Sequence, residues 1–75
     1  MNDFRTRRDT EGVLRRLEER RHMAKLGLDM LLRELGQAVL DNDEAKVEFF
    51  RFDAARAQAR LDEIGKAIDI VKEIA

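Results

Sequence analysis

The chain contains no cysteine, proline, tryptophan, tyrosine or serine. Without cysteine it can form no disulfide, thiolate metal site or cysteine nucleophile. Without serine, and with a single histidine, it lacks the residues of a serine triad. No apolar run reaches the roughly 18 residues that a membrane-spanning helix needs. These absences argue against an enzyme, and we expect no cofactor and no membrane span.

Charged and aliphatic side chains make up most of the 75 residues, with 41% charged and 44% hydrophobic. This mixture, rich in Leu, Ala, Glu and Arg, is typical of long amphipathic helices. The length allows one domain, residues 1–75, with a modest core. The first residues lack the apolar segment of a secretory signal, so we expect a cytoplasmic protein. The net charge of −1 argues against a general nucleic-acid binder.

One strong break in the helical pattern occurs at residues 40–44, Leu-Asp-Asn-Asp-Glu. Asp and Asn favour turns and helix N-caps, and Asp41 with Glu44 resembles a capping box. We therefore predict an all-α antiparallel hairpin with a first helix to residue 40, a turn at 41–43 and a second helix over about 43–74. The first helix is expected to be firm from about residue 11 and frayed over 3–10.

Apolar residues recur with a period of 3.5 residues in both predicted helices, which is the pattern of a coiled coil. In the first helix this seam consists of Leu14, Leu17, Arg21, Ala24, Leu28, Leu31, Leu35 and Ala38. In the second helix it consists of Val47, Phe50, Ala54, Ala57, Leu61, Ile64, Ile68, Val71 and Ala75. If the chain folds back at the turn, pairs whose residue numbers add up to 85 bring the two seams together throughout.

Large apolar residues also occur off the seam, where a lone pair of helices has no core to bury them. Exposed apolar patches mark interfaces, so we predict a homodimer that completes a four-helix bundle, or docking on a larger protein. The residues expected at this interface are Met23, Leu26, Met30, Leu32, Phe49, Phe52, Ile70 and Ile74. Gly27, Gly36 and Gly65 are interpreted as sites of close helix–helix approach, with drift at tolerant surface positions as the alternative.

These features predict a small non-enzymatic protein–protein interaction module, acting as an adaptor, cochaperone or inhibitor. In length and layout alone, the hairpin resembles small RNA-binding helical dimers and the short cochaperones of secretion-needle subunits. No residue motif assigns the chain to either group.

Two alternatives depend on charged residues in the first helix. A nucleic-acid-binding four-helix dimer would use the arginines of the first third. They are Arg5, Arg7, Arg8, Arg15, Arg16 and Arg20. An intermolecular metal site would use the Glu-x-x-His pair Glu19 and His22 together with Glu63. The simpler interpretation of both groups is a solvated charged surface, on which the arginines pair with acidic residues of the second helix. These acidic residues are Asp62, Glu63, Asp69 and Glu73.

Overall fold

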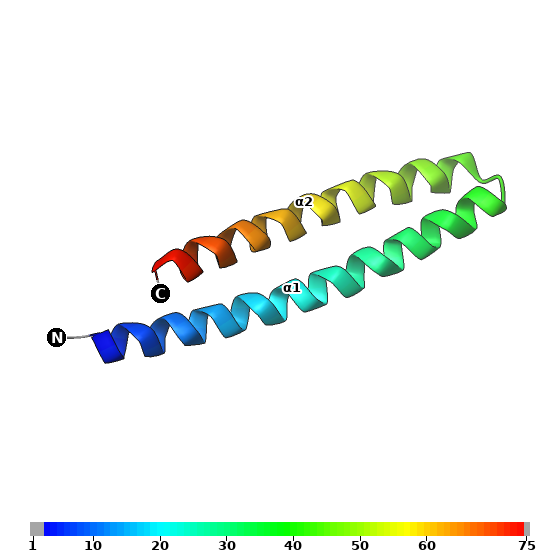
Figure 1. Cartoon of the computed structure of the whole chain (residues 1–75). Coiled ribbons are helices and arrows are strands. Elements are labelled where there is room, and N and C mark those ends of the chain that lie inside the picture. The colour runs from blue at the N-terminus through cyan, green and yellow to red at the C-terminus, as the bar shows by residue number, and fades with distance from the viewer. Residues whose placement is uncertain (1–2, 75) are drawn as a thin grey trace.

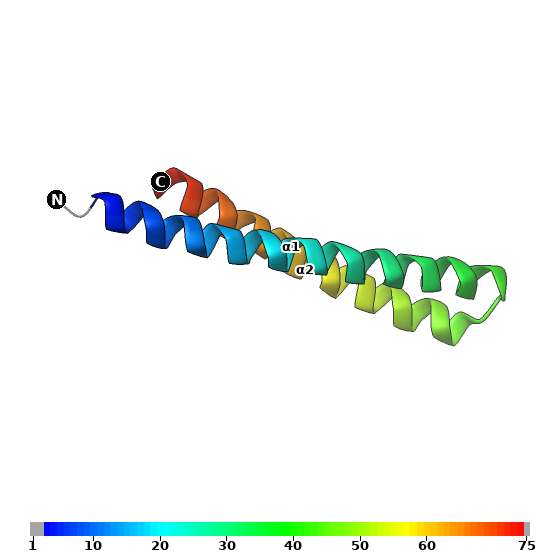
Figure 2. The ribbon, with the colours of Figure 1, turned by 90° about the horizontal axis from the view of Figure 1, so that it is seen from below.

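The computed structural model describes residues 3–74, with side chains from residue 9 onward. Two helices, α1 (Asp3–Leu40) and α2 (Glu44–Ile74), form an antiparallel hairpin with extensive contacts between them. Figures 1 and 2 show the helices side by side with the turn at one end and both chain ends at the other. The rod measures 62 × 14 × 11 Å. The predicted all-α hairpin is confirmed, and residues 3–74 contain no strand.

Helix α1 runs without a break from Asp3 to Leu40 and passes through Gly12. It contains 38 residues and α2 contains 31. Figure 1 accordingly shows the first turns of α1 extending past the end of α2. The open end of the rod therefore ends in a stretch of single helix.

Asn42 closes α1 in a left-handed conformation with a φ of 54°. The amide of Asn42 donates to the Val39 carbonyl and that of Asp43 donates to the Ala38 carbonyl, each at 3.1 Å. This pair of bonds is the Schellman motif, in which a residue with positive φ satisfies the last carbonyls of a helix. Asparagine tolerates this conformation better than most residues other than glycine. The turn therefore follows directly from local chemistry.

The N-cap of α2 is Asp43, so the prediction of a cap at Asp41 was wrong. An Asp43 carboxylate oxygen, Oδ1, accepts a hydrogen bond from the Lys46 amide at 3.1 Å, which satisfies a free donor in the first helical turn. Asp41 still belongs to the end of α1, where its Oδ1 accepts from Gln37 Nε2 at 3.0 Å. The second helix therefore begins at Glu44, one residue later than the predicted start at about residue 43.

The two seams form the contact between the helices. Every seam residue from Leu14 to Ala38 and from Val47 to Val71 is buried or half-buried, while most residues between them are exposed. Ala75, the last predicted seam member, lies outside the described residues. The buried apolar side chains are Leu28, Ala38, Ala54 and Ile68. This core is narrow, and Ile68 is its one fully enclosed large side chain among the described residues.

A hollow between the helices indicates which residues lie at the same height along the rod. Its lining includes Arg20 and Ala24 from α1 together with Arg60 and Ile64 from α2. These pairs agree with the predicted register, which places residue 24 opposite residue 61. Arg21, which was predicted to lie on the seam, is half-buried.

Candidate interaction surface

The hairpin exposes far more large apolar side chains than it buries. Exposed fractions range from 44% at Val13 to 77% at Leu40. Within residues 9–74 the set is Val13, Met23, Leu26, Met30, Leu32, Val39, Leu40, Phe49, Phe52, Ile70 and Ile74. All eight residues predicted for an interface belong to it. Val13 was not among the residues predicted for the interface.

Six of these residues lie along one side of the rod, which we call the methionine face. It consists of Val13, Met23, Met30, Phe49, Ile70 and Ile74. On each helix, these residues come one or five positions before a seam residue, which places them on one flank of the seam. In an antiparallel pair, the corresponding flanks of the two helices lie on the same side of the rod. The hollow that joins Arg20 and Met23 to Arg60 lies on this side. The face therefore contains contributions from both helices.

The other five residues form a second group, the leucine face, on the backs of the helices and the opposite flank. It consists of Leu26, Leu32, Val39, Leu40 and Phe52. On α2, a shallow depression near the turn connects Phe52 with Phe49 and Arg56. The Arg56 guanidinium carbon lies 5.9 Å from the Phe52 ring centroid, a cation–π distance. Phe49 meets the seam residue Phe50 edge-on, with centroids 5.3 Å apart.

The predicted close approach at the glycines does not occur within the hairpin. A Cβ atom added at Gly27, Gly36 or Gly65 would meet nothing within 4 Å. The space beside each glycine is open, so the two helices of one chain do not explain their presence. Either these are tolerant surface positions or a second molecule uses the space.

The arginines of the first third surround α1 without forming a compact site. Arg16 and Arg20 are exposed on the same side of the helix and line one hollow, whereas Arg15 is exposed on the opposite flank. The side chains of Arg5, Arg7 and Arg8 lie outside the described residues. Among residues 9–74, the pairing of this segment with acidic residues of α2 that the simpler interpretation predicts is not formed.

The possible metal ligands do not come together within one chain. Glu19, His22 and Glu63 are all exposed, and residues 9–74 contain no group of three His, Asp or Glu side chains able to hold a metal ion. His22 and Glu19 instead border a shallow hollow with Met23. A site made from them would need a second chain.

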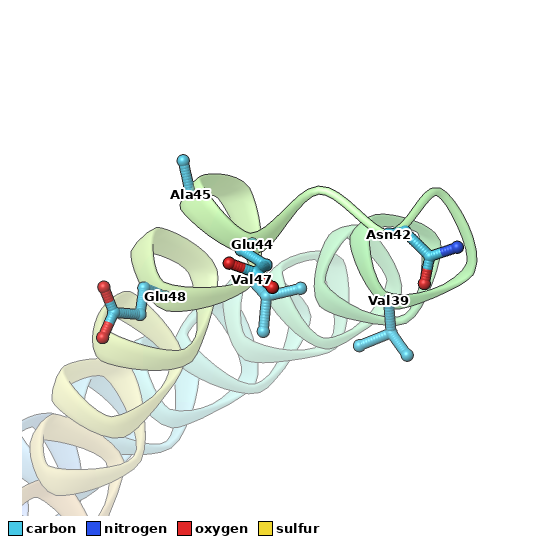
Figure 3. Close-up of a pocket in the computed structure, with 6 residues that line it drawn as sticks. All are labelled: Val39, Asn42, Glu44, Ala45, Val47 and Glu48. Atoms are coloured by element: carbon cyan, nitrogen blue, oxygen red, sulfur yellow. The ribbon is translucent and has the colours of Figure 1, made fainter.

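The turn carries a further hollow, shown in Figure 3, between the end of α1 and the first turns of α2. Val39 and Val47 lie beside it, and Glu44 and Glu48 supply carboxylates. It is open to solvent, and none of its polar lining residues is buried. The hollow lies beside the predicted turn.

Neither helix, over the described residues, is apolar enough along its length to cross a membrane. In comparisons with family models, with curated proteins and with solved structures, no match is found. The two apolar faces are therefore the features from which a function can be argued.

Proposed function

We propose that this chain is a small non-enzymatic interaction module, an adaptor, cochaperone or inhibitor, that binds protein through its exposed apolar helix faces. The observation that carries the proposal is the contrast, within residues 9–74, between four buried apolar side chains and eleven large ones that are at least 44% exposed. Burying one such side chain fully is worth roughly 1.5–3 kcal/mol, so the uncovered faces are a large source of binding free energy.

The total surface of the hairpin supports this proposal. It amounts to 6458 Å². A compact chain of 8.7 kDa would expose about 4,700 Å². The excess of about 1,700 Å² is roughly twice the 800 Å² that one partner contributes to a standard interface. The fold therefore leaves enough surface for a stable complex.

Phe52 provides the sharpest test of the proposal because it is 65% exposed and aromatic, as interface hot spots often are. Affinity purification from the source cells would use the wild-type chain, Phe52→Asp and Ala59→Asp as baits. Ala59 is an exposed residue one heptad further along α2, so its substitution adds the same charge at an equivalent position. We expect a stoichiometric partner with the wild type and Ala59→Asp, and its loss with Phe52→Asp. A partner retained equally by all three baits would contradict the proposal.

A nucleic-acid-binding dimer is the second candidate, and the exposure of Arg15, Arg16 and Arg20 is the observation that favours it. This function predicts an affinity for RNA or DNA that falls steeply with salt concentration, because each phosphate contact releases counterions. Binding through the apolar faces predicts little dependence on salt. A metal-dependent dimer, the third alternative, predicts bound iron or zinc that is lost in His22→Ala.

A further inference from the structure

Along the outer edge of the methionine face, each helix carries four residues that are seven positions apart and form a row. On α1 the row is Arg16, Met23, Met30 and Gln37. On α2 it is Phe49, Arg56, Glu63 and Ile70. The α1 row has apolar residues in the middle and polar ones at the ends, and the α2 row has the reverse. In each row, the pattern of polar and apolar residues is therefore the same in both directions.

We infer that the methionine face binds a second copy of this chain, with the two rods antiparallel and related by a two-fold axis across their middle. In this arrangement each helix lies along its own counterpart. Met23 meets Met30 of the partner subunit, and Phe49 meets Ile70 of the partner subunit. The polar residues also meet one another, because Arg56 faces Glu63 of the partner subunit. The inference rests on the proposed interaction function and names one of its partners.

The parallel arrangement matches the same rows poorly. There α1 would lie along α2 of the other copy, and residues at equal height would meet. Met23 would then face a glutamate (Glu63), and Ile70 would face an arginine (Arg16). Every apolar member of the two rows would be opposite a polar one. Within these two rows, only the antiparallel arrangement places apolar side chains against apolar side chains.

Charge along the rod favours the same orientation. Residues 26–59, the half at the turn, carry four Lys or Arg and seven Asp or Glu. Residues 3–25 and 60–74, the open half, carry eleven and nine. Antiparallel packing places each acidic half beside the basic half of the other copy, where opposite charges attract. On the methionine face, Arg20 then faces Glu34 of the partner subunit.

The space at Gly27 fits the two-fold axis. Gly27 is exposed on the methionine face, and its missing Cβ leaves open space. The pairing of Met23 with Met30 of the partner subunit places the axis beside Gly27, so both copies present a glycine there. On α2 the axis passes near Arg60, so the two copies of this arginine lie close to each other. Glu63, one turn away, offsets the repulsion between them.

The available area is sufficient for such a dimer. If the methionine face supplies about half of the excess, about 850 Å² per copy, the dimer buries about 1,700 Å² in total, the size of a standard interface. Phe52 borders this contact beside Arg56, and the rest of the leucine face remains free for another protein. Self-association and partner binding can therefore be tested separately.

Light scattering on the full chain tests the dimer first, with an expected mass of twice 8.7 kDa. Ile70→Glu should raise the dissociation constant at least about tenfold, because the substitution places a carboxylate in the apolar contact. Leu26→Glu is the matched control on the leucine face and should change the constant less than about threefold. A monomer at micromolar concentrations, or equal effects of the two substitutions, would overturn the inference.

Cysteine cross-linking tests the orientation against a background free of cysteine. Gly27→Cys should form a disulfide-linked dimer under mild oxidation, because the two copies of this residue meet at the axis. Gly36→Cys, the same substitution on the opposite flank, should not. A mixture of Met23→Cys and Glu63→Cys chains tests the parallel arrangement. Cross-linking in that mixture, with none at Gly27→Cys, would refute antiparallel packing.

A charge exchange supplies an independent test. Arg20 and Glu34 are 14 residues apart on α1, about 21 Å, so they make no contact within one chain. Glu34→Arg should weaken the dimer several-fold, and adding Arg20→Glu should restore it. Failure of the second substitution to restore the dimer would count against the pairing. If the chain is monomeric while Phe52→Asp still abolishes partner capture, the dimer is wrong and the proposed function stands.

Discussion

Replacing Ile68 by alanine should destabilise the hairpin more than any other single truncation of an aliphatic side chain in the described chain. Ile68 is 0% exposed, so the substitution removes three carbons from a fully enclosed position. Measured costs of Ile→Ala in cores are about 2–5 kcal/mol. Because neighbouring seam residues are only half-buried and water can enter, we expect the lower part of this range. The higher helix propensity of alanine returns about 0.4 kcal/mol.

Urea denaturation followed by far-UV circular dichroism is the appropriate assay, because α1 and α2 form nearly the whole described chain and there is no tryptophan or tyrosine to report by fluorescence. The midpoint should fall while the slope stays constant. Leu26→Ala is the control, since Leu26 is 46% exposed and outside both the seam and the methionine face. We expect it to cost less than about 1 kcal/mol. Equal losses for the two variants would refute the assignment of the core.

Three further predictions use the same assay. Asn42→Gly should preserve or raise the stability of the hairpin. Asn42→Val should lower it by about 1–2 kcal/mol, because a β-branched residue resists the φ of 54°. Equal stabilities of the two variants would contradict this argument. Asp43→Ala should cost about 1 kcal/mol through loss of the N-cap, and more than Asp41→Ala, so the reverse order would contradict the cap assignment. Gly36→Ala should add up to about 1 kcal/mol, because the new Cβ meets nothing within 4 Å, and a loss would show that a neighbour occupies the site.

The fold was predictable because the seam is a repeating signal that extends over both helices. The position of the turn followed from Asp41, Asn42 and Asp43, which are polar residues between two apolar repeats. Which aspartate caps α2 was not predictable, because all three residues are compatible with a turn or a cap. Only the left-handed conformation of Asn42 decides that Asp43 becomes the cap.

The candidate surface was predictable in composition and less so in arrangement. The periodicity identified Met23 and Phe52 as off-seam residues, and the structure shows both exposed. Sorting such residues onto two faces required the relative rotation of the helices, which depends on their pairing. The glycines were misjudged within the hairpin for a similar reason, since an approach between backbones cannot be inferred from one helix alone.

The turn also determines the order in which the hairpin can assemble. Ala38 and Val47 enclose a short loop, whereas Leu14 and Val71 enclose almost the whole chain, and the entropy cost of closing a loop grows with its length. Each contact nearer the turn shortens the effective loop for the next, so the helices join progressively from the turn to the open end. In the reverse direction the open end separates first, and backbone amides there should exchange with solvent sooner than those beside Ala54.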